Sequence, residues 1–226
     1  AIPMCGAVLN AINMRLDAAT VAFILQHGEA KLLLVDKEFG PLAEEALALM
    51  STPPPAIFID DATYAEGKLI GDEGFEDLVR QGADSPLTQI SADASDFLPK
   101  DEWDAIALNY TSGTTGNPKG VVSHHRGAYL NAVSNALTWN MGDHPVYLWT
   151  LPMFHCNGWC FPWTLAANAG TSVCLRQVRD DAIYHAMAYY GVTHFCGAPV
   201  VLNTLLSASD ELKNLVQHEV KVMTAG

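Results

Sequence analysis

Short apolar runs alternate along the chain with longer segments in which apolar residues recur every three or four positions. Runs typical of buried strands cover 31–36, 56–60, 104–110, 146–150, 171–175, 192–196 and 220–224. Helical spacing covers 15–27, 39–50, 123–139, 158–168, 180–190 and 198–207, and Asp17 is placed to cap the first of these helices. This order predicts an α/β fold, with layered, parallel-rich sheets and flanking helices.

The segment 61–102 interrupts this alternation. It is rich in Gly, Asp, Ser and Pro and holds one helical pattern, near 74–81. Loops that run over a surface have such a composition because their backbone polar groups must reach water. We expect 61–102 to be a surface connection within one domain.

The formal net charge of −13 would repel a nucleic-acid backbone over most of the surface. An anionic small ligand would need local donors, such as backbone N–H groups, a helix N-terminus or a few lysines. No apolar run approaches the roughly 20 residues that a membrane-spanning helix needs. We therefore expect neither nucleic-acid binding nor a membrane span.

Five cysteines are scattered mostly through apolar segments. An odd number without regular spacing is typical of reduced thiols, which indicates a cytoplasmic protein. Cys156 and Cys160 form the only close pair in the sequence, and no second pair completes a set of zinc ligands.

The two ends of the chain lack the usual features of protein termini. The first residues have neither the charged start nor the cleavage site of a signal peptide. The chain opens inside an apolar segment and closes on the strand pattern of 220–226, whereas domains usually end in polar surface segments. We expect a piece of a longer protein.

The segment Thr111–Gly120 concentrates four hydroxyl groups, three glycines and one lysine. Hydroxyls and exposed backbone N–H groups are the donors that a polyphosphate needs, and glycines let the backbone approach its oxygens. Lys119 adds a point charge. The segment follows a strand pattern and precedes a helical one, so we expect an anion-binding turn between a strand and a helix. Because Pro118 precedes Lys119, the segment departs from the P-loop of kinases and GTPases.

The string YTSGTTGNPKG, from Tyr110 to Gly120, resembles the phosphate-binding signature of the adenylate-forming (AMP-binding) superfamily. The resemblance covers essentially the whole chain. The string LPMFHCNGWCFPW, from Leu151 to Trp163, resembles the second core motif of the short- and medium-chain acyl-CoA synthetase branch. It is similar to the strings of 3-methylmercaptopropionyl-CoA ligases and acyl-activating enzymes.

This resemblance implies that 1–226 is a partial N-terminal AMP-binding domain, without the start of the domain and without the C-terminal domain. The implied enzyme is an acid–thiol ligase of fatty acid metabolism. It joins a small carboxylic acid to CoA through an acyl-adenylate, at the expense of ATP, with Mg²⁺ as cofactor and with AMP and pyrophosphate released. We expect the piece alone to be inactive, and a homodimer is left open.

The resemblance also assigns the phosphate-binding residues. They are expected to wrap the β- and γ-phosphates of ATP, and they are Thr111, Ser112, Gly113, Thr114, Thr115 and Gly116. Lys119 steadies the loop or the pyrophosphate. Thr111 is the candidate for the hydroxyl nearest Mg²⁺, so Thr111 and Lys119 count as candidate catalytic residues.

A second set of assignments falls downstream. His155 is implied to lie beside the acyl carboxylate and the α-phosphate as a catalytic residue, and Trp159 to gate the acyl tunnel. Cys156 and Trp159 are placed at the nucleotide pocket. Gly197, Ala198 and Pro199 resemble a substrate-side turn. His124 and His125 are expected to be solvated at the start of a helix.

Two other functions stay open. An adenylate-forming enzyme could pass its adenylate to an acceptor other than CoA, as luciferases and peptide-synthetase adenylation domains do. A phosphate-binding module could bind ATP or pyrophosphate without turnover. Release of AMP, and its dependence on CoA, would separate the three.

Overall fold

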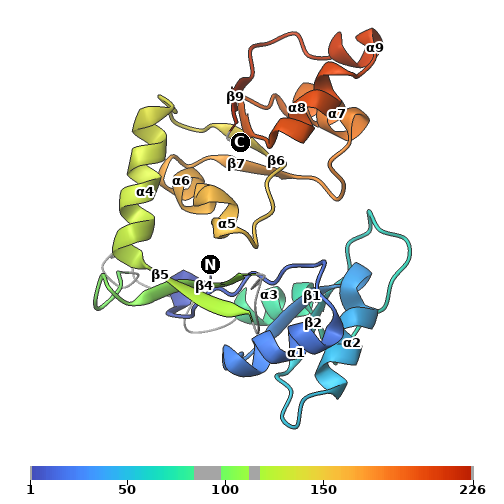
Figure 1. The fold of residues 1–226 in the computed structure, drawn as a ribbon, viewed down its shortest axis with the longest axis vertical. Coiled ribbons are helices and arrows are strands. Elements are labelled where there is room, and N and C mark those ends of the chain that lie inside the picture. The colour runs from blue at the N-terminus through green and yellow to red at the C-terminus, as the bar shows by residue number, and fades with distance from the viewer. Residues whose placement is uncertain (1, 84–97, 112–117, 225–226) are drawn as a thin grey trace. The chain divides into compact units, whose positions relative to one another are not determined.

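A computed structural model describes residues 2–83, 98–111 and 118–224 (Figure 1). The chain divides into two units, Ala1–Val122 and Ser123–Gly226. Each unit has apolar clusters of its own and a parallel sheet flanked by helices. The α/β fold class predicted from the sequence is confirmed.

Unit 1 begins with a parallel three-stranded sheet in the order β1-β2-β3. Its elements are η1 (Pro3–Cys5), α1 (Ala18–His27), β1 (Leu33–Asp36), η2 (Lys37–Phe39), α2 (Gly40–Ala48), β2 (Ala56–Ile59), β3 (Glu73–Gly74), α3 (Phe75–Ala83), β4 (Ala105–Thr111) and most of β5 (Lys119–His124). Val21 and Leu25 of α1 pack against Ala46 of α2. Asp17 caps α1, as predicted, because it accepts a hydrogen bond from the Thr20 N–H at 2.9 Å.

Strands β4 and β5 pair with each other in a two-stranded sheet. Their connection, 112–118, is too short for a parallel crossover, which takes about a dozen residues or more, so the strands run antiparallel. Leu9 extends this sheet, because its N–H donates to the Ile106 carbonyl and its carbonyl accepts from the Leu108 N–H. Figure 1 shows β4 and β5 side by side, with the helix α4 beginning only after β5.

The prediction that the glycine-rich segment leads directly into a helix is wrong. The helix expected at 123–139 begins at His125, and β5 precedes it. Most of β5 is exposed, so no alternation of buried and exposed positions marks it in the sequence. The segment therefore connects two strands of a hairpin, and a helix N-terminus does not follow it immediately.

Unit 2 contains a parallel four-stranded sheet in the order β7-β6-β8-β9. Its elements are α4 (His125–Thr138), β6 (Val146–Trp149), α5 (Cys156–Trp159), α6 (Phe161–Ala167), β7 (Thr171–Cys174), α7 (Asp180–Tyr190), β8 (His194–Cys196), α8 (Pro199–Leu206), α9 (Asp210–Lys213) and β9 (Lys221–Met223). Each strand except the last is followed by at least one helix, which is the connection that parallel strands require.

The central strand β6 separates the two apolar clusters of unit 2. Leu148 packs with Ile183 of α7 on one face of the sheet. Tyr147 and Trp149 pack with Phe161 of α6 on the other face. Successive side chains of a strand point to opposite faces, so β6 is apolar throughout because helices cover both sides.

The described part of 61–102 contributes to unit 1 in two ways. β3 pairs with β2 at the edge of the sheet, and Ile70 is buried in a cluster with Val35 and Ala43. Residues 84–97 lie outside the described part. Among the described helices, none combines the length and the apolar content that crossing a bilayer would require.

Candidate functional site

The two ends of the glycine-rich segment meet at the end of the β4–β5 hairpin. Thr111 closes β4 and Lys119 opens β5, and the side chains of both are exposed. The Thr111 hydroxyl donates to the Lys119 carbonyl at 3.5 Å. Both side chains are thus available to a ligand at the hairpin end. The predicted residues Ser112, Gly113, Thr114, Thr115 and Gly116 lie outside the described residues.

Tyr110 anchors the end of β4 to the helix α1. Its hydroxyl lies 2.7 Å from Nδ1 of His27, and the two rings meet edge to face. Burial raises the pKa of Tyr110, so the hydroxyl stays protonated at neutral pH. This contact holds the strand that leads into the glycine-rich segment.

The residues that follow β6 form a turn with left-handed backbone geometry. From Cys156 to Cys160, every residue has a positive φ, between 48° and 62°. The Gly158 N–H donates to the His155 carbonyl at 2.9 Å, and the Cys160 N–H donates to the Cys156 carbonyl at 3.1 Å. We call 156–160 the left-handed turn; it replaces the start of the single helix predicted for 158–168.

Gly158 and Asn157 explain why the chain can turn this way. Glycine adopts positive φ without steric cost, and asparagine tolerates it better than most residues. Both are buried, and Gly158 lies so close to the Trp149 ring that a Cβ there would be 2.4 Å from Cζ3. For Cys156, Trp159 and Cys160 the same geometry carries strain, which tertiary packing must offset.

Side chains of the left-handed turn and its flank are accessible on one side. His155 and Cys156 are exposed, and Nε2 of His155 lies 3.8 Å from Sγ of Cys156. Trp159 is half-buried against the apolar cluster of Tyr147 and Phe161. The structure therefore brings His155 and Cys156 into contact, and Trp159 follows three residues later in the same turn.

A second predicted turn, Gly197–Pro199, lies at the same edge of the sheet. β6 and β8 are parallel neighbours, so their carboxyl ends meet at one edge, and ligands of α/β sheets commonly bind there. The Thr150 hydroxyl, just after β6, donates to the Cys196 carbonyl at the end of β8. The Gly197 N–H donates to the Met223 carbonyl at 3.0 Å, and Pro199 begins α8.

Sequence reasoning missed two residues of this site. Asn135 of α4 directs Nδ2 at the Trp159 carbonyl and at the Thr164 hydroxyl, each at 3.2 Å. Asn157 is 3% exposed, and its Oδ1 has no hydrogen-bond partner among the described residues. The Asn-Gly pair at 157–158 is a turn signal in the sequence; nothing in the sequence marks Asn135.

His124 has a structural role that the sequence did not predict. Its Nδ1 accepts a hydrogen bond from the Gly127 N–H at 2.9 Å, so it caps α4. His125 is the first residue of that helix.

Among the described residues, no group of three or more His, Cys, Asp or Glu side chains could hold a metal ion. A cavity of about 770 Å³ lies in unit 1 between the N-terminal segment and β1, but it is mostly apolar and none of the predicted site residues line it. The motif residues therefore define the candidate site better than the cavity does.

Relatives of known name cover the chain from end to end. The acetate/butyrate–CoA ligase AAE7, peroxisomal, of Arabidopsis thaliana is 52% identical over 238 residues, which cover 100% of this chain and 40% of the relative. The acetate–CoA ligase CCL3 of Humulus lupulus is 47% identical over 237 residues, which cover 100% of this chain and 41% of the relative. The chain thus spans about 40% of the length of these curated relatives.

Solved structures share the fold at lower identity. The N-terminal domain of FACL13 from Mycobacterium tuberculosis has a TM-score of 0.74 at 24% identity, covering 98% of this chain and 51% of that one. The luciferase-like enzyme of the Zophobas morio mealworm also has a TM-score of 0.74, at 18% identity, covering 99% of this chain and 49% of that one. The model of the family described as AMP-binding enzyme matches residues 1–226, and the chain belongs to this family.

Proposed function

We propose that the protein carrying this chain is an ATP-dependent, AMP-forming carboxylate–CoA ligase. The observation that carries the proposal is the hydroxyl- and glycine-rich segment Thr111–Gly120 in a chain that matches the AMP-binding family throughout. In the proposed reaction, a carboxylate attacks the α-phosphate of ATP and releases pyrophosphate. The thiol of CoA then displaces AMP from the acyl-adenylate.

The substrate class follows from the names of the relatives. Acetate, butyrate, 2-methylpropanoate and benzoate appear in the names of relatives that are 46–52% identical to this chain. We propose a short or medium-sized monocarboxylic acid. The apolar surroundings of Trp159 suit such a group, because its uncharged end gains by leaving water.

The phosphate-binding role goes to the hairpin end. The proposed ligands of the β- and γ-phosphates are Thr111, Ser112, Gly113, Thr114, Thr115 and Gly116. Lys119 adds a positive charge beside them. Donors fixed before the reaction stabilise the negative charge that develops as pyrophosphate leaves, so this chemistry needs no acid–base pair.

Mg²⁺ fits this segment only when the phosphates of ATP supply most of its ligands. Mg²⁺ is commonly held by one or two carboxylates together with substrate phosphates, and the described residues here offer the Thr111 hydroxyl and no acidic cluster. When bound, the metal would supply charge neutralisation on the phosphates. Thr111 would contribute one oxygen to it.

The acyl and nucleotide contacts go to the sheet edge of unit 2. We propose that His155 donates to the acyl carboxylate or the α-phosphate, and that Trp159 forms a wall of the acyl pocket. Cys156 and Trp159 contribute to the nucleotide pocket, and Gly197, Ala198 and Pro199 form the turn on the substrate side. The exposed imidazole of His155, and its place directly before the turn that contains Trp159, support these roles.

The cellular location and the assembly state stay predictions. The sequence predicts a cytoplasmic protein, whereas several relatives carry the word peroxisomal in their names. The cytoplasm and the peroxisomal matrix both fit a ligase that acts on water-soluble acids. A homodimer is also a prediction, and sedimentation of the purified protein would decide it.

Release of AMP tests the proposed function. The protein carrying this chain is incubated with ATP, Mg²⁺ and an acid from acetate to octanoate, with and without CoA. The proposal expects AMP and acyl-CoA in equal amounts when CoA is present. AMP formation without any need for a thiol would favour another acceptor, and ATP binding without AMP would favour the phosphate-binding module.

A further inference from the structure

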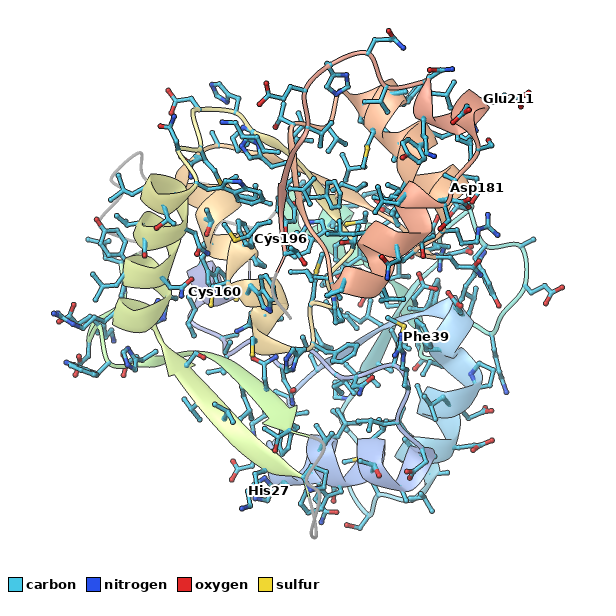
Figure 2. All side chains as sticks on the ribbon, turned by 45° about the horizontal axis from the view of Figure 1, so that its top comes forward. His27, Phe39, Cys160, Asp181, Cys196 and Glu211 are labelled. Carbon is cyan, nitrogen blue, oxygen red and sulfur yellow. The ribbon has the colours of Figure 1, made fainter. Side chains whose placement is uncertain are left out.

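Cys156 and Cys160 stand at the two ends of the left-handed turn. The Cys160 N–H donates to the Cys156 carbonyl, and Sγ of Cys160 is directed back to that same carbonyl oxygen at 3.9 Å. Figure 2 labels Cys160 at the junction of α5 and α6. The sulfur of one cysteine therefore reaches the backbone of the other.

The two thiols differ in their surroundings. Cys156 is exposed, and its Sγ contacts Nε2 of His155, a base that can accept the thiol proton. Cys160 is partly buried, and burial, followed by the nearby Cys156, raises the pKa of its thiol. Cys196 is different again, because burial raises its pKa to about 11 and leaves it inert.

The spacing of Cys156 and Cys160 along the turn suits a disulfide at the level of the Cα atoms. Residues four apart in a helical turn of either hand have Cα atoms about 6 Å apart, within the range of about 4.4–6.8 Å found across disulfides. The Cβ atoms must come closer than an ideal turn allows, so the turn has to rearrange. L-residues in left-handed geometry are strained by about 1–2 kcal/mol each, and rearrangement would release part of that strain.

We propose that Cys156 and Cys160 form a redox-active dithiol site, which reacts with hydroperoxides to give an intramolecular disulfide. In the first step the Cys156 sulfur, its proton taken by His155, attacks the peroxide oxygen; the O–O bond breaks and Cys156 becomes a sulfenic acid, with water or an alcohol released. In the second step the Cys160 sulfur attacks the Cys156 sulfur and displaces water. Two thiols are oxidised and one hydroperoxide is reduced.

The order of the steps follows from the different exposure of the two thiols. The thiolate is the reacting form, so the exposed thiol beside an imidazole reacts first. The partly buried Cys160, whose pKa is raised, waits until a sulfenic acid forms next to it. Dithiothreitol reverses the disulfide by exchange.

The consequence for the site is local. His155 and Trp159 flank or belong to the same turn, so closing the disulfide moves both. If the proposed function holds, oxidation lowers the ligase rate, and dithiothreitol restores it. This consequence rests on the proposed function, whereas the disulfide itself does not.

Peptide mapping of the unmodified protein is the primary test. The protein carrying this chain is treated with hydrogen peroxide, alkylated and digested. We expect the peptide that spans 156–160 to lose two hydrogen atoms and to escape alkylation, and dithiothreitol to restore both alkylation sites. The proposal is overturned if both cysteines remain alkylatable, or if they carry only separate oxygen adducts.

Three variants sharpen the test. Cys160→Ser should stop at the sulfenic acid of Cys156, which dimedone traps, and Cys156→Ser should give no loss of hydrogen in the peptide. Cys5→Ser, a matched change at an exposed thiol in unit 1, should leave the disulfide unchanged. The rate of disulfide formation is compared between the folded protein and the protein unfolded in urea. Equal rates would show that the turn does not hold the two cysteines in position to react. Loss of the disulfide contradicts the dithiol site alone, whereas absence of AMP release contradicts the proposed function alone.

Discussion

Gly158 shows at the scale of one residue how the turn and the core depend on each other. Its φ of +58° lies in the left-handed region, and the Trp149 ring occupies the space where a side chain would begin. The first condition strains any L-residue with a Cβ, and the second leaves no room for that Cβ. The residue between the two candidate substrate contacts, His155 and Trp159, is therefore fixed by the packing of the strand β6.

Gly158→Ala should destabilise the protein more than the same change at Gly191 or Gly142. Left-handed geometry costs an alanine about 1–2 kcal/mol, and overlap with Trp149 adds about 1–3 kcal/mol. Gly191→Ala has the same geometry at φ +62° but open space, so only the first cost applies. Gly142→Ala has neither and should cost nothing. Urea unfolding measures the three, and equal losses at Gly158 and Gly191 would contradict the overlap.

His194 makes stability depend on pH. Its Nε2 is buried without a partner among the described residues, while Nδ1 lies 2.7 Å from the Thr193 hydroxyl. Burial, and to a lesser extent Lys221, lowers the pKa of His194 below its ordinary value of 6.5. As the pH falls below about 6.5, His194 binds a proton in the unfolded chain but stays neutral in the folded chain, so stability decreases.

The free energy of unfolding should therefore fall from pH 7.5 to pH 5.5, and the slope should be smaller in His194→Gln. The slope is the readout, because the variant also changes packing against Trp139. His218→Gln is the matched control: its Nε2 already bonds the Val192 carbonyl at 2.9 Å. An unchanged slope in His194→Gln would contradict this account.

At the scale of elements, α4 holds the left-handed turn through Asn135. Its side-chain nitrogen lies within hydrogen-bond distance of the carbonyl at the end of α5 and of the Thr164 hydroxyl in α6. α4 also packs along α6. The helix that follows the hairpin thus supports the backbone of the candidate acyl wall.

Asn135→Ala should lower stability by about 1–2 kcal/mol, because the Trp159 carbonyl loses its donor. It should also raise KM for the acid, since Trp159 is less firmly held. Ser134→Ala, at an exposed position of the same helix that makes no side-chain contact with Asn135, should change stability by less than about 0.5 kcal/mol. Denaturant titration and acid kinetics on the same samples give both quantities. A raised KM for ATP alone would contradict the role of this contact.

Hydrophobic patterning predicted the elements in which buried residues recur at a regular interval. It missed the elements in which burial follows no regular interval. α7 has the predicted bounds, Asp180–Tyr190, because its apolar face lies on the sheet. β5 is mostly exposed, so its pattern carries no signal, and the sequence predicts a loop and a helix start at 119–124, where the structure has a strand. The left-handed turn depends on the contact of Gly158 with Trp149, which lies nine residues earlier in the chain. Local propensity cannot predict this contact, because it considers only neighbouring residues.

The sequence predicts which residues form the candidate site and their order along the chain. It does not predict how these residues are arranged in space. The clustering of His155, Cys156 and Trp159 follows from adjacency in the sequence. The meeting of their turn with Gly197 does not, because it depends on which strand lies next to β6. Ligand roles for all the predicted residues stay predictions until the kinetics are measured.

At the scale of the whole molecule, the proposed ligands of the β- and γ-phosphates and the proposed acyl wall belong to different units. The phosphate segment belongs to unit 1, and His155 and Trp159 belong to unit 2. Every acid shares the same ATP, whereas only the acid changes from one substrate to the next. Substitutions in the two units should therefore differ in how their effects vary with the acid.

Thr114→Val should lower kcat/KM by about 10²–10³ for every acid, since it removes one donor from developing charge. Trp159→Ala should give an effect that changes with acyl length, by about 1–3 kcal/mol for a change the size of a methylene. The measurement is kcat/KM from acetate to octanoate, with Thr138→Val, at the exposed end of α4, as control. Parallel profiles for Thr114→Val and Trp159→Ala would show that Trp159 is no acyl wall.

The left-handed turn has a stereochemical consequence. Positive φ is the natural region of mirror-image amino acids, so a D-alanine at position 158 would have the backbone conformation it prefers. Its methyl group would replace the other α-hydrogen of the glycine and point away from the place where an L-residue meets Trp149. At position 158, the restriction of ribosomal synthesis to L-residues is a constraint that the fold accommodates with glycine, and chemical synthesis could remove it.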